Sequence, residues 1–159
     1  MNQNRYPLRF NVGFLINQPV GSTRDIHFDF PSLYFHPDLE VKDLKGVARV
    51  SRTPQGILLQ ADFEAVVKTE CVRCLNEFEQ PLHIRFQDIY AFSSRSVSES
   101  GLILPEDGNI NLEPLLREYF LVEMPIRPLC REDCKGLCPV CGEDLNIETC
   151  EHSERVKLE

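Results

Sequence analysis

The sequence lacks the patterns that mark export or membrane insertion. Its opening segment, MNQNRYPLRF, contains no basic region followed by an apolar run, which a signal peptide would show. No apolar stretch approaches the roughly 20 residues that a membrane-spanning helix requires. We therefore expect a cytoplasmic protein that contacts no membrane, in a compartment where glutathione and thioredoxin keep cysteine thiols reduced.

Patterns typical of catalysis are missing as well. The chain has no glycine-rich phosphate loop, and no Ser-His-Asp arrangement stands out. His27, His36 and His83 are isolated along the chain, and we interpret each as a core or surface residue. We therefore expect no enzymatic activity and no small-molecule substrate.

The net charge of −8 is unevenly distributed. Residues 1–52 carry seven Lys and Arg against five Asp and Glu, whereas the remaining residues carry ten against twenty. This acidity argues against a protein that coats nucleic acid by charge alone, because such binding requires Lys and Arg to neutralise phosphates. A direct RNA contact would need a local basic patch. The candidates are Arg5, Arg9, Arg49 and Arg52, if the fold gathers them.

Two long stretches alternate apolar and polar residues with the period of two that is typical of a half-buried strand. The first spans residues 57–71 and the second spans residues 78–90. The segment between them, CVRCLN at 71–76, predicts a hairpin turn. Shorter candidate strands are 8–15, 25–30 and 47–52, separated by prolines.

One amphipathic helix is predicted over residues 112–123, after a Ser-rich loop at 93–109. Asn111 is its candidate N-cap. Its apolar stripe consists of Leu112, Leu115, Leu116, Tyr119 and Phe120. We therefore predict an α+β fold, with an antiparallel β-rich domain that is barrel- or sandwich-like, one main helix and a small C-terminal cysteine module. The predicted division is 1–128 for the β-rich domain, 129–152 for the module and 153–159 for a tail.

The seven cysteines favour metal ligation over disulfides, because the number is odd and the expected compartment is reducing. The strongest signal is Cys138-Pro-Val-Cys141-Gly142, in which two thiolates can reach one ion and the glycine permits a positive φ. We predict one structural zinc ion. The favoured ligand set is Cys130, Cys134, Cys138 and Cys141, and the ribbon-like alternative keeps the last two and adds two from Cys134, Cys150 and His152.

A second pair, Cys71 and Cys74, has the same spacing. Leu75 stands where a c-type haem site would need histidine. A hairpin turn is also the wrong setting for a thioredoxin-like redox pair, which sits at a helix N-terminus. The pair could instead join Cys138 and Cys141 in one four-cysteine site, or it could be an idle pair of thiols in the turn.

Several of these segments resemble one bacterial family, the YceD-like or large ribosomal RNA subunit accumulation proteins. The similar parts are CVRCL at 71–75 with the strand to Phe86, the run INLEPLLREYFLVEMPIRPLC, and the tail DCKGLCPVCGEDLN. Where tails of the family commonly end in Cys-x-Cys, this chain has Cys150-Glu151-His152.

The resemblance implies a non-enzymatic role in accumulation or processing of large-subunit ribosomal RNA. Its implied partner is the precursor of the large ribosomal subunit, through RNA or a ribosomal protein. The alternatives that the residues leave open are a zinc-thiol redox sensor and a general zinc-stabilised binding module.

Overall fold

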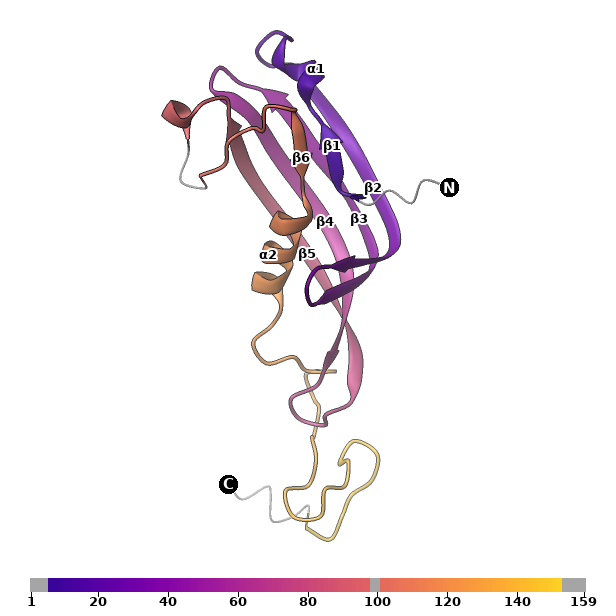
Figure 1. Cartoon of the computed structure of the whole chain (residues 1–159). Coiled ribbons are helices and arrows are strands. Elements are labelled where there is room, and N and C mark those ends of the chain that lie inside the picture. Colours follow the sequence, from indigo (N-terminus) through magenta and orange to yellow (C-terminus); the bar gives the residue numbers. More distant parts are fainter. Residues whose placement is uncertain (1–5, 98–100, 153–159) are drawn as a thin grey trace.

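Four long strands form an antiparallel meander in which each strand pairs with its neighbours in sequence. The computed structural model describes residues 6–97 and 101–152 of the chain (Figure 1). The sheet is long and twisted, and the helix packs against one of its faces. The strands are β2 (Thr23–Phe35), β3 (Leu39–Arg52), β4 (Gly56–Glu70) and β5 (Glu77–Ala91).

One face of this sheet is apolar, because the alternating pattern sends every second side chain to the same side. In β4, Ile57, Leu59, Ala61 and Phe63 are buried, and the residues that alternate with them face outward. The phenyl ring of Phe63 packs against that of Phe28 in β2, with ring centroids 5.8 Å apart. The opposite face of the sheet is polar and open to solvent.

The apolar face is covered by segments that precede β2 and segments that follow β5. A small antiparallel sheet pairs β1 (Arg9–Asn11) with β6 (Asn109–Asn111), and α1 (Gly13–Ile16) follows β1. The main helix, α2 (Glu113–Glu123), follows β6. Ile110, Leu116 and Phe120 of these elements join the same buried cluster as the large sheet. The Tyr119 ring also stacks on Phe86 of β5 at 4.0 Å.

The predicted α+β class, an antiparallel β-rich domain with one main helix and a cysteine module, is confirmed. Of the two predicted shapes the sandwich is the nearer one, because the small sheet lies against one face of the larger sheet. The predicted strands at 57–71 and 78–90, their hairpin turn and the helix at 112–123 all appear. The N-cap of this helix is Leu112, one residue after the expected Asn111, whose side-chain oxygen accepts the backbone N–H of Glu113 at 3.1 Å.

One predicted strand needs correction. The strand expected at 8–15 is interrupted, since Asn11 Oδ1 accepts the backbone N–H of Gly13 at 2.8 Å and turns the chain into α1. The expected loop between the second long strand and the helix is present over the described residues 93–97 and 101–108. It contains a 3₁₀ turn at Ser94–Ser96, and its residues Leu102 and Leu104 exchange backbone hydrogen bonds with Ala91 at the end of β5.

The hairpin of β4 and β5 extends beyond the rest of the sheet. Pairing between β3 and β4 ends at Lys42 and Val66, whereas β4 and β5 remain paired as far as Glu70 and Glu77. The end of the hairpin therefore projects as a two-stranded stalk, and the cysteine-rich tail lies at its tip (Figure 1). Within the described residues, no helix has both the length and the apolar character needed to cross a membrane.

Candidate metal centre

The tip of the stalk folds into a compact turn that presents two thiols. The backbone N–H of Leu75 donates to the carbonyl of Cys71, and the N–H of Cys71 donates to the carbonyl of Asn76, both at 2.9 Å. Leu75 adopts a φ of 63°, which bends the chain beneath the sulfurs of Cys71 and Cys74. The turn thus leaves both thiols on one side, where a single ion can reach them.

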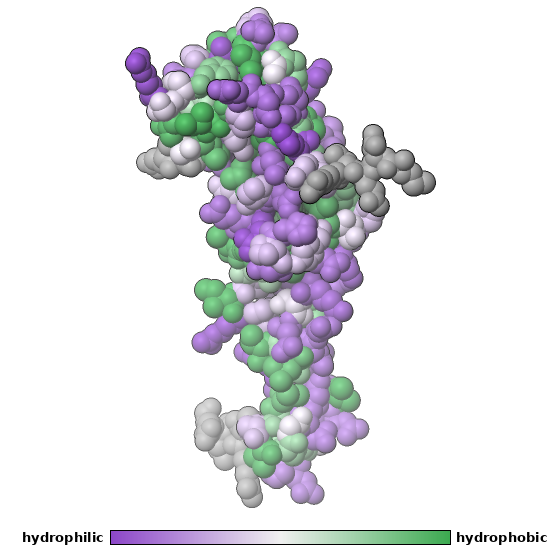
Figure 2. Space-filling view, viewed as in Figure 1, coloured by the Kyte–Doolittle hydropathy of each residue, from purple (hydrophilic) through white to green (hydrophobic). Residues whose placement is uncertain are grey.

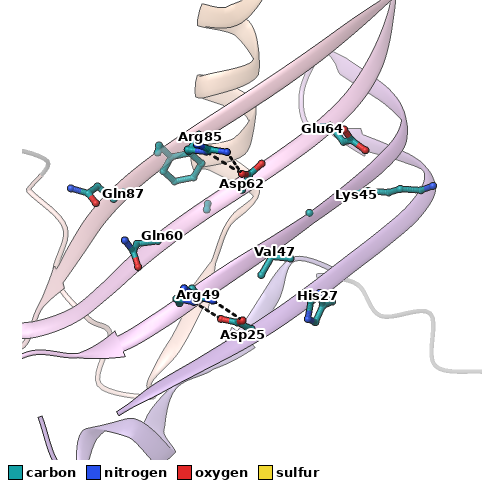
Figure 3. Close-up of a pocket in the computed structure, with 13 residues that line it drawn as sticks. Asp25, His27, Lys45, Val47, Arg49, Gln60, Asp62, Glu64, Arg85 and Gln87 are labelled. Atoms are coloured by element: carbon teal, nitrogen blue, oxygen red, sulfur yellow. Dashed lines mark hydrogen bonds and ion pairs between the residues drawn. The ribbon is translucent and has the colours of Figure 1, made fainter. Parts of the chain in front are cut away.

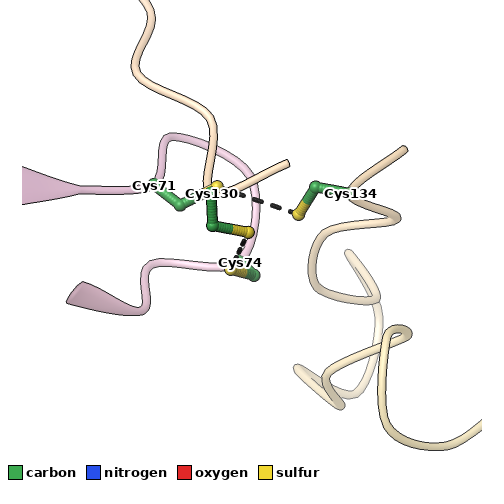
Figure 4. Close-up of side chains that lie close together, drawn as sticks. All are labelled: Cys71, Cys74, Cys130 and Cys134. Atoms are coloured by element: carbon green, nitrogen blue, oxygen red, sulfur yellow. Dashed lines mark hydrogen bonds between the residues drawn. The ribbon is translucent and has the colours of Figure 1, made fainter. Parts of the chain in front are cut away.

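The tail supplies two further thiols to the same point (Figure 4). The sulfur of Cys71 lies 3.7 Å from that of Cys134, and the sulfur of Cys74 lies 3.7 Å from that of Cys130. All four cysteines are free thiols, and a disulfide would need sulfurs about 2.05 Å apart. Four sulfurs at about 2.3 Å from one ion stand about 3.8 Å apart in a tetrahedron. The spacing therefore fits a metal ion and does not fit a disulfide.

Backbone hydrogen bonds also fasten the tail to the stalk. Val72 N–H donates to the carbonyl of Pro128 at 3.0 Å, and Leu137 N–H donates to the carbonyl of Arg73 at 3.2 Å. Gly136 passes so close to the hairpin that a Cβ there would lie 3.2 Å from the carbonyl oxygen of Arg73. Its φ of 76° also favours glycine. These contacts hold the two cysteine pairs at a fixed separation.

The side chain of Asn146 makes hydrogen bonds that orient Cys134 in this group. Its side-chain amide donates to the sulfur of Cys134 at 3.4 Å, while its carbonyl oxygen accepts the backbone N–H of Lys135 and a guanidinium N–H of Arg131. The Arg73 guanidinium donates to the carbonyl of Cys134 at 2.9 Å. Hydrogen bonds of this kind fix a metal ligand and stabilise its thiolate form.

The thiols of this group have divergent pKa values. The backbone N–H of Cys74 lowers the pKa of the Cys71 thiol to about 6, and the amide of Asn146 lowers the pKa of Cys134. Burial, together with the adjacent Cys134 sulfur, raises the pKa of Cys130 to about 12. Negative charge on some of the sulfurs therefore opposes ionisation of the rest. A bound cation would remove this opposition, because it stabilises every thiolate it ligates.

The remaining tail residues form a second group. Cys138, Cys141, Cys150 and His152 each offer one ligand atom, and these atoms all lie within 4.8 Å of one another. The backbone N–H of Cys141, and after it that of Val140, lowers the pKa of the Cys138 thiol to about 6. Both groups have a donor set that could hold a metal ion.

The structure pairs the predicted ligands differently from the sequence analysis. Cys130 and Cys134 lie with Cys71 and Cys74, whereas Cys138 and Cys141 lie with Cys150 and His152. The compact set of four tail cysteines is therefore not brought together, whereas the second group matches the ribbon-like alternative in which Cys150 and His152 join Cys138 and Cys141. The single ion expected from the sequence corresponds to two candidate groups, and one of them joins the tail to the hairpin. The contribution of Asn146 was missed, because nothing in the spacing of the cysteines points to it.

The predicted arginine patch is not gathered either. Arg5 lies outside the described residues, and Arg9 pairs with Asp107 at 3.1 Å on the small sheet. Arg49 lies on the open face of the large sheet. Arg52 donates to the backbone carbonyls of Ile16 and Thr53.

The open face of the sheet forms a shallow groove in which acids and bases are already paired (Figure 3). The Nε and Nη2 groups of Arg49 donate to the two carboxylate oxygens of Asp25, at 2.7 and 3.1 Å. The Arg49 hydrogen bond lowers the pKa of Asp25. Hydrogen bonds from His83 first, and also from Arg85, lower the pKa of Asp62. The groove therefore presents compensated charge, which is poorly suited to attracting phosphates.

Comparison with known proteins gives a consistent set of relatives. An uncharacterized protein of Mycobacterium leprae (strain TN) is 29% identical over 112 residues, which is 68% of this chain and 52% of that protein. The uncharacterized protein YlbN of Bacillus subtilis (strain 168) is 26% identical over 94 residues, which is 55% of each chain. The chain thus spans about half the length of the curated relatives it matches. No solved structure matches it significantly.

One family model covers most of the chain. It matches residues 59–158, from within β4 through both cysteine groups, and is described as "Large ribosomal RNA subunit accumulation protein YceD". The resemblance noted at the CVRCL turn is thereby confirmed, and the chain belongs to the YceD family.

Proposed function

We propose that this chain is a non-enzymatic ribosome-assembly factor that supports accumulation of large-subunit ribosomal RNA in the cytoplasm. The observation that carries the proposal is the match to the YceD family, whose described role is large ribosomal RNA subunit accumulation. The matched region contains the stalk and all eight candidate metal ligands. The proposal therefore assigns the working part of the molecule to the stalk and its cysteine-rich tip.

A structural zinc ion at Cys71, Cys74, Cys130 and Cys134 is part of this proposal. Three of these residues are buried, and four thiolates fill the tetrahedral shell of zinc. No coordination position would remain open for water or substrate, so the ion would shape the protein and would not act in catalysis. Its effect would be to hold the tail against the hairpin.

The tip of the molecule has a surface suited to binding a partner. Figure 2 shows apolar side chains on the narrow end of the molecule, where the stalk meets the tail. Val72 and Leu75 at the stalk tip are 49% and 54% exposed, and Ile126 before the tail is 97% exposed. Exposed apolar side chains of this kind favour contact with another macromolecule where they gather on one surface. Because Arg49 and Arg85 on the open face of the sheet are paired with Asp25 and Asp62, we infer that contact with the precursor of the large subunit runs through this end.

The test is a deletion strain of the organism that carries the chain. We expect mature large-subunit RNA to fall relative to small-subunit RNA and precursor large-subunit particles to accumulate, as measured by gradient profiles and quantification of both RNAs. Wild-type protein and a Lys68→Ala control, which removes only the stalk ion pair with Glu77, should restore the ratio. A Cys74→Ser/Cys134→Ser variant should not restore it.

The alternative is a zinc-thiol redox sensor, and the exposed thiol of Cys141 favours it. A sensor predicts normal subunit ratios in the unstressed deletion strain and a defect only after exposure to peroxide. Normal ratios and normal precursor levels at several growth temperatures would contradict the assembly proposal.

A further inference from the structure

We propose that Cys138, Cys141, Cys150 and His152 form a second zinc site, which binds its ion independently of the site at the stalk. The inference goes beyond the proposed function and holds whether or not the chain acts in ribosome assembly. Three observations carry it, namely the local backbone, the position of the four ligand atoms and an unpaired histidine nitrogen.

The backbone at Cys138 repeats the turn that forms the first site. Gly142 N–H donates to the carbonyl of Cys138 at 2.9 Å, as Leu75 N–H donates to Cys71. Cys138 N–H donates to the carbonyl of Glu143 at 2.8 Å, as Cys71 N–H donates to Asn76. Gly142 has a φ of 79°, and Leu75 has a φ of 63°. Two unrelated stretches of sequence thus fold the same way around a Cys-x-x-Cys pair. The shared geometry indicates that both turns present two ligands to one ion.

The second pair of ligands comes from the end of the tail. Cys150 and His152 are half-buried, and all four ligand atoms lie within 4.8 Å of one another. Zinc binds sulfur at about 2.3 Å and imidazole nitrogen at about 2.0–2.1 Å. Small side-chain adjustments therefore bring all four donors to one ion.

The Nδ1 atom of His152 supplies evidence that does not depend on the cysteines. It is the single buried side-chain nitrogen or oxygen within residues 6–97 and 101–152 that has no hydrogen-bond partner. A buried polar atom without a partner is costly, and natural proteins nearly always provide one. A metal ion at the centre of this group would be that partner, since neutral imidazole ligates through the nitrogen that carries no proton.

The donor set points to zinc as the chemical class of the ion. Three thiolates and one imidazole form a closed tetrahedral shell that is common in structural zinc sites, and hard cations such as magnesium and calcium prefer oxygen ligands. Between Cys138 and His152, Leu145 is the buried apolar side chain other than cysteine in the described structure, and the segment is otherwise held by hydrogen bonds such as those of Asp144 and Asn146. The ion would close the loop from Cys138 to His152 onto itself.

The test counts zinc bound to the full chain, purified without chelator, by elemental analysis and native mass spectrometry. We expect two zinc ions in the wild type and one in His152→Ala, with unchanged circular dichroism of the sheet. His152→Cys should retain two ions, because a cysteine thiolate ligates zinc as an imidazole does. His83→Ala is the matched control, since His83 is exposed and bonded to Asp62, and it should retain two ions.

A second readout identifies the ligands. Substitution with cobalt should give absorption bands of a three-sulfur, one-nitrogen site in addition to those of a four-sulfur site, and His152→Ala should remove the former alone. The proposal is overturned if the wild type binds one zinc and His152→Ala leaves that value unchanged. It is equally overturned if His152→Ala still binds two ions, or if thiol titration shows that Cys138, Cys141 and Cys150 are oxidised in the zinc-loaded protein.

Discussion

The large sheet and the cysteine-rich tip are stabilised by different physical means. The sheet buries a continuous cluster that includes Phe35, Phe63 and Phe120, each fully inaccessible to solvent. Burial of each such side chain contributes about 1.5–3 kcal/mol. Within residues 129–152, the part of the tail that the structure describes, the buried side chains are Cys134, Cys138 and Leu145, so apolar burial cannot account for the order of this segment.

The difference shows why the cysteines are concentrated at one end. A segment of about twenty residues cannot form a core, but a structural zinc ion can contribute about 10–16 kcal/mol in small peptides. The sheet needs no such ion, because its length and alternating pattern supply the burial. The tip of the stalk combines both means of stabilisation, because its strands belong to the sheet and its thiols belong to the proposed metal site.

The largest effect should come from breaking the link between the two regions. Cys74→Ser should abolish binding of the ion shared by hairpin and tail, because three thiolates leave the tetrahedral shell incomplete. Limited proteolysis should then cleave within residues 129–137 at least tenfold faster than in the wild type, while β4 and β5 remain resistant. Equal cleavage rates in the two proteins would contradict a shared site.

A substitution in the core of the large sheet should destabilise the sheet and leave the metal sites intact. Phe63→Ala should lower the free energy of unfolding by about 3–5 kcal/mol, because it leaves a cavity beside Phe28. Urea denaturation followed by circular dichroism measures this loss. Below the transition the variant should keep its full zinc content, and loss of zinc from a fully folded sheet would show that the two regions are not separable.

A smaller effect is expected at the hydrogen bond to Cys134. Asn146→Ala removes the amide that donates to this sulfur, and loss of such a contact typically weakens metal affinity about 10–100-fold. Competition with a chromogenic chelator measures the change. Asn17→Ala, at an exposed position outside the tail, is the control and should compete like the wild type. Identical affinities in all three proteins would remove Asn146 from the site.

The smallest effect concerns an ion pair that joins the helix to the turn after β2. Arg117→Ala breaks the contact with Asp38 at 2.7 Å, but the Asp38 side chain is 60% exposed. Surface pairs of this kind contribute less than about 1 kcal/mol. Thermal unfolding should therefore shift by a few degrees at most, with zinc content unchanged. A larger shift would mean that the helix depends on this pair more than on Leu116 and Phe120.

The sheet was predictable because its signals are local. Alternation from Leu59 to Val67 marks a half-buried strand without any knowledge of its partners, and the turn at 71–76 follows from the two strands around it. The stripe from Leu112 to Phe120 marks the helix in the same way. Pairing of β1 with β6 was not predictable, since it joins residues near positions 10 and 110.

The cysteine groups were predictable in kind and only partly in membership, since the set of Cys138, Cys141, Cys150 and His152 was among the alternatives and the set that joins Cys71 and Cys74 to Cys130 and Cys134 was not. The Cys-x-x-Cys spacing marks a ligand pair locally, but the choice of the second pair depends on which segments the fold brings together. The stalk carries Cys71 and Cys74 to the first cysteines of the tail, so proximity in sequence misassigned Cys130 and Cys134. A site that joins segments far apart in sequence can be recognised only once the path of the chain is known.

The claim that one ion clamps the stalk tip to the tail is tested most directly by hydrogen exchange with and without a zinc chelator. The amide of Val72, bonded to Pro128, and the amide of Leu137, bonded to Arg73, should lose protection together when the metal is removed. The amides of Leu59 and Phe63 should keep theirs. Loss of protection in the tail while Val72 stays protected, or loss throughout the sheet, would contradict the clamp.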